Sequence, residues 1–190
     1  MCRLASFFHN PINGDIVVHD INSHSETQKA LNLNEKLWRE GHYFPDGTIE
    51  CRVTNSDHIS QDECNERLRN RFPNFIDFFN WSMDEICKDG AFSGSLDLRS
   101  LTSAAGLKLP TEIGGSLYLS SLTSAAGLKL PTKCGSLYLR SLTSAAGLKL
   151  PTKCGYLDLR SEVKQQYQDA INKMEQKTKN RKAKKQKDSL

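Results

Sequence analysis

The sequence lacks several features that would place it in a well-defined class. It has no run of about 18 apolar residues, and its first twenty residues have neither a basic start nor an apolar core segment, which argues against a membrane span and a secretory signal. No Cys-x-x-Cys or His-x-x-x-His spacing occurs, so a compact zinc motif is absent from the sequence. We therefore expect a cytoplasmic protein that has no bound metal or other cofactor.

Charge is distributed unevenly along the chain. The composition, 190 residues of which 25% are charged and 37% hydrophobic, suits one large or two small globular domains. Residues 1–93 carry nine Lys and Arg against fifteen Asp and Glu, a net charge of −6, whereas residues 94–190 carry seventeen against seven, a net charge of +10. Only the second half is therefore suited to attract a polyanion.

An internal repeat dominates the second half. The sequence SLTSAAGLKLPT occurs at 100–111, 121–132 and 141–152, and each unit opens with a glycine followed by Leu-x-Leu. A unit of 20–21 residues is too short to bury its apolar face alone, so we expect the units to stack as a β-rich solenoid over residues 91–161. The expected core positions of the third unit are Leu137, Leu139, Leu142, Ala145, Ala146, Leu148 and Leu150.

The short period, the Leu-x-Leu core and the Leu-Pro corner resemble leucine-rich repeats, and more closely the GGSLDL/LTSLP-type repeats of uncharacterised phage and bacterial proteins. The resemblance covers residues 94–161. Leu101, Leu122 and Leu142 stand where an asparagine ladder normally follows the strand. A leucine-rich-repeat horseshoe and a β-helix-like solenoid with two or three short strands per coil both remain open. The resemblance implies a binding or scaffolding role.

The open end of such a stack needs a cover. After Arg160 apolar residues recur at helical spacing, which predicts a capping helix over residues 162–176; they are Val163, Tyr167, Ala170, Ile171 and Met174. From 177 to 190 apolar residues almost vanish and Lys and Arg dominate. Because such a segment cannot drive packing, we expect a disordered basic tail.

The first ninety residues show no repeat and are predicted to form a small α+β domain, residues 1–90, with the element order ββαββαα. Turn residues at Asn13-Gly14 and at Pro45-Asp46-Gly47 predict two hairpins. A capping signature at Ser60 begins a helix that ends before Pro73. One stretch is rich in aromatic residues without interleaved basic ones, so we expect core rather than base stacking; it holds Phe72, Phe75, Phe78, Phe79 and Trp81.

Cys51 and His42 are the candidate catalytic residues. If Asp46 and Gly47 are the two central turn residues, Cys51 and His42 face each other across the second hairpin and form a nucleophile with its base, or half of a metal site. No third, orienting group is identifiable, so we do not assign either role.

The remaining histidines and cysteines are too scattered to predict a site. His9, His19 and His24 are interpreted as surface histidines, and Cys64 and Cys87 as half-buried thiols. An N-terminal nucleophile at Cys2 is not supported, since nothing later in the chain resembles an amidotransferase. Cys134 and Cys154 occupy the same position in adjacent coils, within the range of a disulfide, but are expected to stay thiols.

The outer face of the solenoid supplies the candidate binding residues. Outward positions repeat in each unit and form stacked rows; these are Asp97, Tyr118, Tyr138 and Asp158; Arg99, Ser120, Arg140 and Arg160; and Lys108, Lys129 and Lys149. Tyr and Arg are favoured at protein interfaces. Copied coils offer the same group many times, whereas catalysis needs different groups at one point, so the repeats are not expected to be an active site.

These observations favour a non-enzymatic interaction or scaffolding module that binds an unknown protein partner through the solenoid. One alternative is a polyanion or nucleic-acid binder that uses the basic half and tail, with strong salt dependence. A second alternative is a Cys/His-dependent enzyme in residues 1–90 that uses Cys51 and His42.

Overall fold

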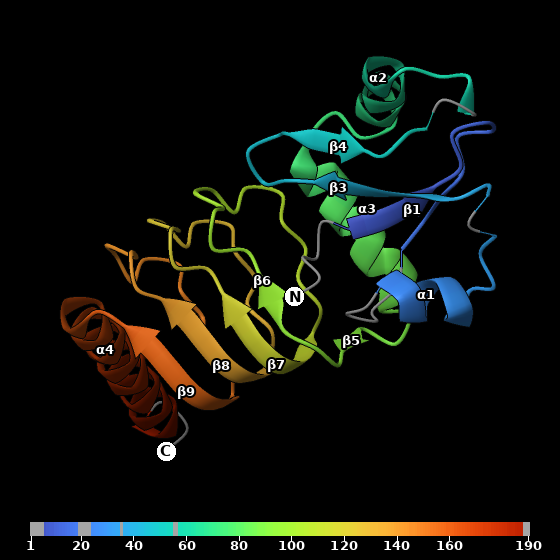
Figure 1. The fold of residues 1–190 in the computed structure, drawn as a ribbon. Coiled ribbons are helices and arrows are strands. Elements are labelled where there is room, and N and C mark those ends of the chain that lie inside the picture. Colours follow the sequence, from blue (N-terminus) through green and yellow to red (C-terminus); the bar gives the residue numbers. More distant parts are fainter. Residues whose placement is uncertain (1–5, 19–23, 35, 55–56, 188–190) are drawn as a thin grey trace.

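The chain forms an N-terminal sheet with helices, a β-solenoid of about three turns and a long C-terminal helix (Figure 1). The computed structural model describes residues 6–18, 24–34, 36–54 and 57–187. The elements up to residue 86 follow the order ββαββαα; they are β1 (Ser6–His9), β2 (Ile16–Val17), α1 (His24–Ala30), β3 (Arg39–Tyr43), β4 (Ile49–Cys51), α2 (Gln61–Arg71) and α3 (Phe75–Ile86). The short strands β5 (Ala91–Phe92) and β6 (Leu96–Asp97) follow, then β7 (Glu112–Tyr118), β8 (Lys133–Leu139), β9 (Lys153–Leu159) and α4 (Ser161–Lys187).

The N-terminal sheet is antiparallel, with the strand order β2-β1-β3-β4. In the turn between β3 and β4, the Gly47 amide donates to the Phe44 carbonyl at 2.9 Å, and the Phe44 amide donates to the Thr48 carbonyl at 2.8 Å. Gly47 has a φ of 90°, which glycine adopts without steric cost. The hairpin loop therefore contains three residues, 45–47, rather than the two that the sequence suggested.

Helices α2 and α3 cover the N-terminal sheet. Each begins with a side-chain cap, since Ser60 Oγ accepts from the Glu63 amide and Asn74 Oδ1 accepts from the Asp77 amide. The aromatic stretch forms core, as predicted: Phe78 is fully buried, 5.4 Å from Phe7 between ring centroids.

Helix α3 also joins the sheet to the solenoid (Figure 1). The side chain of Asn80 donates to the Gly106 carbonyl at 2.9 Å and accepts from the Lys108 amide at 2.8 Å. Buried apolar residues from Phe7 to Val163 form one continuous core cluster. The two regions are thus packed together, and the proposed boundary near residue 90 stays a prediction.

The solenoid is built on one parallel sheet, with the order β5-β7-β8-β9 and with β6 beside β7. Matching residues of successive coils pair directly, as in Leu117↔Leu137↔Leu157. In the described residues each return segment between β7, β8 and β9 contains no further strand. Of the two alternatives left open by the sequence, the one with two or three short strands per coil is therefore not met in these coils.

The predicted leucine column fills the solenoid interior. In the third unit Leu137, Leu139 and Leu142 have zero exposure, and Leu148 is buried. Ala145 and Leu150 are half-buried, but Ala146 is exposed, so its assignment to the core was wrong. The Leu148 amide donates to the Ala145 carbonyl across a turn with Gly147 at a φ of 75°, which directs the intervening Ala146 side chain to solvent.

A threonine ladder connects the coils where the Leu-Pro corner ends. Thr111 Oγ1 donates to the Gly90 carbonyl at 2.8 Å, Thr132 Oγ1 donates to the Thr111 carbonyl at 3.0 Å, and Thr152 Oγ1 donates to the Thr132 carbonyl at 2.9 Å. The same carbonyls also accept from the backbone amides of Thr111, Thr132 and Thr152, so side-chain and backbone bonds together link each coil to the next. Leu122 and Leu142, which stand where an asparagine ladder would follow the strand, are fully buried.

Helix α4 covers the last coil, as the capping prediction requires (Figure 1). Val163 is buried, Gln166 Oε1 accepts from the Ala145 amide, and the Tyr167 hydroxyl accepts from the Leu150 amide at 3.4 Å. The helix continues to Lys187 and does not end at 176. Residues 177–187, which were expected to be a disordered tail, are therefore helical. Lys, Arg, Gln and Ala favour helix even without an apolar face. In the described part of the chain, no helix is long and apolar enough to cross a membrane.

Candidate functional site

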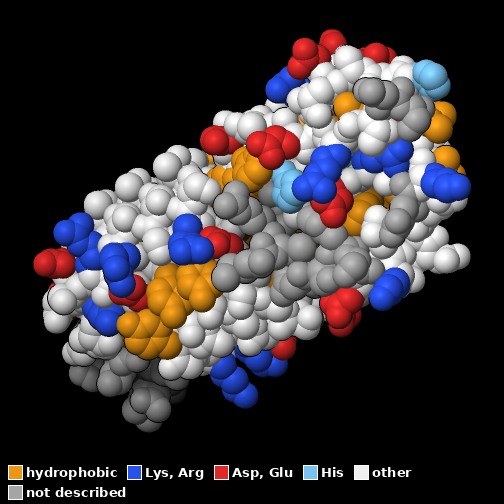
Figure 2. Space-filling model, in the orientation of Figure 1, with side chains coloured by type: hydrophobic (Ala, Val, Ile, Leu, Met, Phe, Trp, Pro, Cys, Tyr) orange, Lys and Arg blue, Asp and Glu red, His pale blue; other side chains and the backbone are white. Residues whose placement is uncertain are grey.

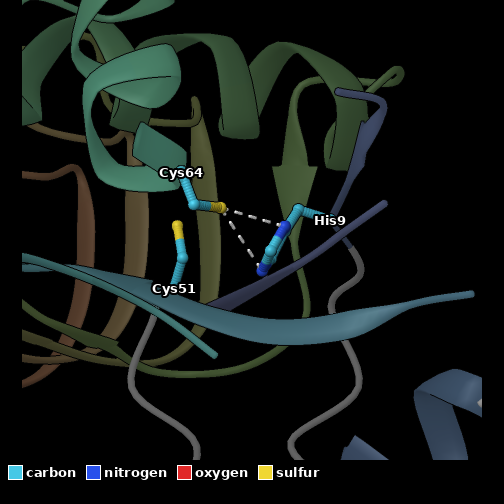
Figure 3. Close-up of side chains that lie close together, drawn as sticks. All are labelled: His9, Cys51 and Cys64. Atoms are coloured by element: carbon cyan, nitrogen blue, oxygen red, sulfur yellow. Dashed lines mark hydrogen bonds between the residues drawn. The ribbon is translucent and has the colours of Figure 1, made fainter. Parts of the chain in front are cut away.

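Three side chains that are distant in the sequence meet in the core of the N-terminal region: His9 from β1, Cys51 from β4 and Cys64 from the first turn of α2 (Figure 3). Their nitrogen and sulfur atoms lie within 4.8 Å of one another, and all three residues are buried. We call this group the His-Cys-Cys cluster. The sequence interpretation of His9 as a surface histidine and Cys64 as a half-buried thiol was wrong.

The hairpin register explains why His9, and not His42, is the histidine beside Cys51. With a three-residue loop, Cys51 pairs with Gly41, and His42 pairs with Glu50. Neighbouring residues of a strand point to opposite faces, so His42 lies on the other face of the sheet. The predicted Cys51–His42 pair is therefore wrong, by a shift of one residue.

Gly41 makes room for this arrangement. Phe7 pairs with Gly41, and a Cβ atom on Gly41 would overlap the Phe7 ring. The ring can thus lie across the strand and pack beside His9, with 5.9 Å between ring centroids. A side chain at position 41 would displace the ring.

The imidazole of His9 is oriented by the backbone. Nε2 lies 3.0 Å from the Arg52 carbonyl oxygen, which can only accept a hydrogen bond. Nε2 therefore carries a proton and donates to this carbonyl, and Nδ1 lies 3.4 Å from Cys64 Sγ.

The two thiols differ in their acidity. A hydrogen bond with Cys51 lowers the pKa of Cys64 to about 5 against the opposing effect of burial, and His9 and Arg67 act in the same direction. Hydrogen bonding to Cys64 and burial raise the pKa of Cys51. Cys64 is therefore the more acidic thiol of the pair, and it sits at the N-terminal end of α2, where negative charge is stabilised.

A small cavity of about 40 Å³ adjoins the cluster. Its lining includes Pro11, Gly14, Ile16 and Leu68 besides the three cluster residues. Arg67 borders it as well, and its guanidinium donates to the Pro11 carbonyl and to Glu63. The cavity is large enough for water but not for an organic substrate of ordinary size.

The outer face of the solenoid sheet holds the second candidate site. Tyr118 and Tyr138 stack with ring centroids 4.7 Å apart and planes at 13°, and Tyr156 contacts Tyr138 in a tilted arrangement at 5.7 Å and 49°. We call these three residues the tyrosine row. Figure 2 shows a continuous hydrophobic patch over the solenoid with charged side chains at its borders. The sequence analysis missed Tyr156. It lies two residues before Asp158 of the predicted row on β9, so the alternation of a strand places it on the same face.

Charges beside the tyrosine row are paired within the chain. Arg99 binds Asp97 and lies 5.4 Å from the Tyr118 ring centroid, and Arg140 binds Asp158 at 2.8 Å. These predicted binding residues are thus brought together with the tyrosines, and their charges cancel. Arg160 is exposed just beyond β9.

The predicted lysine row, Lys108, Lys129 and Lys149, is exposed on the return segments. Cys134 and Cys154 pair in register with 3.5 Å between sulfur atoms, as their repeat positions predicted, and both are free thiols. Cys87 is half-buried. Cys2, His19 and the side chain of His24 lie outside the described residues.

Comparison with protein-family models, curated proteins and solved structures finds no match to this chain.

Proposed function

We propose that this protein is a non-enzymatic interaction module whose tyrosine row binds a protein partner. The observation that carries the proposal is the row of aromatic contacts that runs from Tyr118 through Tyr138 to Tyr156 on an outward sheet face. Tyr156 is 55% exposed. Rigid, partly exposed tyrosines supply binding area at low entropic cost, which is why they are frequent in protein interfaces.

The geometry of the stack favours a protein over a sugar or a nucleic-acid base. Ring faces bind sugars and bases by stacking, but here Tyr138 covers one face of Tyr118, and Arg99 lies over that ring as well. Edges and hydroxyl groups are left for a partner, and these suit packing against apolar side chains and hydrogen bonding to backbone groups. The resemblance to leucine-rich repeats, which implies a binding role, agrees with this proposal.

The ion pairs at the border argue against a polyanion at this face. Arg99 and Arg140 are each neutralised by an aspartate, so the patch itself has little net charge. Polyanion binding would instead use the lysine row on the return segments, where Lys108, Lys129 and Lys149 are exposed. The two functions are therefore assigned to different surfaces and can be separated by mutation.

The test is co-purification of the tagged full chain from its own cells, with nuclease and at two salt concentrations. A partner that binds the tyrosine row should resist both treatments and be lost from the Tyr118→Ala/Tyr138→Ala variant, because apolar contacts are screened little by salt. The matched control, Lys129→Ala/Lys149→Ala, should keep it. A partner that nuclease removes and that only the lysine variant loses would refute the proposal in favour of polyanion binding.

A further inference from the structure

The His-Cys-Cys cluster has no part in the proposed interaction surface, yet it gathers three of the ligands that zinc prefers. Zinc binds Cys Sγ at about 2.3 Å and His nitrogen at about 2.0–2.1 Å, so ligand atoms on a tetrahedron lie roughly 3.6–3.8 Å apart. In the cluster Cys64 Sγ lies 3.4 Å from His9 Nδ1, and all three ligand atoms fall within 4.8 Å of one another. Shifts of about 1 Å or less at the sulfur atoms would complete the geometry.

The histidine is already oriented as a metal site needs. Because Nε2 donates a hydrogen bond to the Arg52 carbonyl, Nδ1 is the ring nitrogen that faces Cys64 and is left for a metal. A hydrogen bond from the distal nitrogen to a backbone carbonyl is the usual support of a metal-bound imidazole, since it fixes the tautomer and the ring orientation. The ring also packs against the buried Phe7, which limits its rotation.

Charge balance also favours a divalent ion. Two buried thiolates side by side would repel each other at high cost, whereas two thiolates and one Zn²⁺ have no net charge. Binding would release one proton from each thiol that is protonated in the free protein.

We propose that His9 Nδ1, Cys51 Sγ and Cys64 Sγ bind one Zn²⁺ ion, with water from the adjoining cavity as the fourth ligand. Among the described histidine, cysteine and carboxylate side chains, these three form the group whose ligand atoms lie close enough together to hold one metal ion. The cavity of about 40 Å³ has room for the water.

The ion would join three segments, β1, β4 and the start of α2, which are linked here by packing and by hydrogen bonds such as the one from the Cys51 amide to Asn65 Oδ1. These ligands are separated by 42 and 13 residues in the sequence, so the site would close long loops, and metal binding would contribute directly to folding. This role is independent of whether the tyrosine row binds a protein.

The first test is cobalt substitution in the full-length chain. The protein is purified under reducing conditions, treated with a chelator and titrated with Co²⁺. We expect saturation at about one equivalent, with a thiolate-to-cobalt charge-transfer band and the intense visible bands of tetrahedral cobalt, and then displacement by Zn²⁺. This test uses the wild-type chain. Absence of the thiolate band, or the weak spectrum of octahedral cobalt, would overturn the proposal.

The second test measures zinc content in ligand variants. Cys51→Ser and Cys64→Ser should reduce the bound zinc from about one equivalent to about none in buffer that contains a competing chelator, whereas the control Cys154→Ser in the solenoid should retain it. Equal zinc in the cluster variants and the control would overturn the proposal.

Thiol labelling in the wild-type chain covers the case in which a variant fails to fold. Zn²⁺ should protect two thiols, Cys51 and Cys64, from alkylation and leave Cys87 unaffected. Equal labelling of Cys51 and Cys64 with and without zinc, at a temperature where the protein is folded, would contradict the site.

Discussion

Replacing Leu137 by alanine measures how strongly the stacked coils hold the solenoid together. The side chain has zero exposure and lies between Leu117 and Leu157 of the neighbouring coils. Removing a fully buried leucine beyond Cβ costs about 2–5 kcal/mol, as lost transfer energy plus the cavity that remains. The matched variant, Leu157→Ala, changes the same repeat position in the last coil, where the side chain is only half-buried and has one neighbouring coil. We expect about half the loss there.

Urea unfolding followed by far-UV circular dichroism gives both free energies of unfolding, provided that the slope with denaturant is unchanged. The prediction is a lower midpoint for both variants and a larger loss for Leu137→Ala by roughly 1–2 kcal/mol. Equal losses, or a loss below about 1 kcal/mol at Leu137, would show that the leucines do not form a continuous stacked column.

Three further changes test other parts of the fold. Gly41→Ala should lower the free energy of unfolding by about 1–3 kcal/mol, measured in urea, because the new methyl group overlaps the buried Phe7 ring; an unchanged midpoint would refute that packing. Burial raises the pKa of Asp57, but hydrogen bonds from Arg39 and from the backbone outweigh it and lower the pKa overall. Its contribution to stability is therefore present above about pH 4 and is lost as the pH falls below that, so unfolding of Asp57→Asn should depend less on pH between about 5 and 3 than that of the wild type; parallel curves would contradict the ion pair. Burial, and then hydrogen bonding to its neighbour, raise the pKa of Cys134 to about 12, so iodoacetamide at pH 8 should label it far more slowly in the folded than in the unfolded chain; equal rates would show that the thiol is accessible.

The solenoid was predictable because its signal is repeated. Each coil carries the same leucines at the same positions, and direct pairing such as Cys134↔Cys154 follows from equal spacing alone. The exposed Ala146 was missed because a turn with a positive φ at Gly147 interrupts the period-2 alternation. The length of α4 was missed because composition was taken as a sign of disorder, although the same residues favour helix.

The His-Cys-Cys cluster was not predictable by the same means. Its three residues come from separate elements, and only the pairing of β1 with β3 and the packing of α2 bring them together. The one local prediction, Cys51 opposite His42, failed because a three-residue loop shifts the register by one residue. If a three-residue hairpin loop, which is also common, had been assumed, Cys51 would have been placed opposite Gly41. Gly41 lies on β3, the strand beside β1, which carries His9.

The central claim, that a protein binds at the tyrosine row, is tested most directly by site-specific photocrosslinking in the protein's own cells. A photoreactive phenylalanine analogue is placed at Tyr138 in one variant and at Lys129, on a return segment, in the other. We expect one discrete crosslinked protein from the variant at position 138 and no crosslinked product of the same mass from the variant at position 129. The same crosslinked product from both positions, or none from position 138 at matched expression, would contradict it.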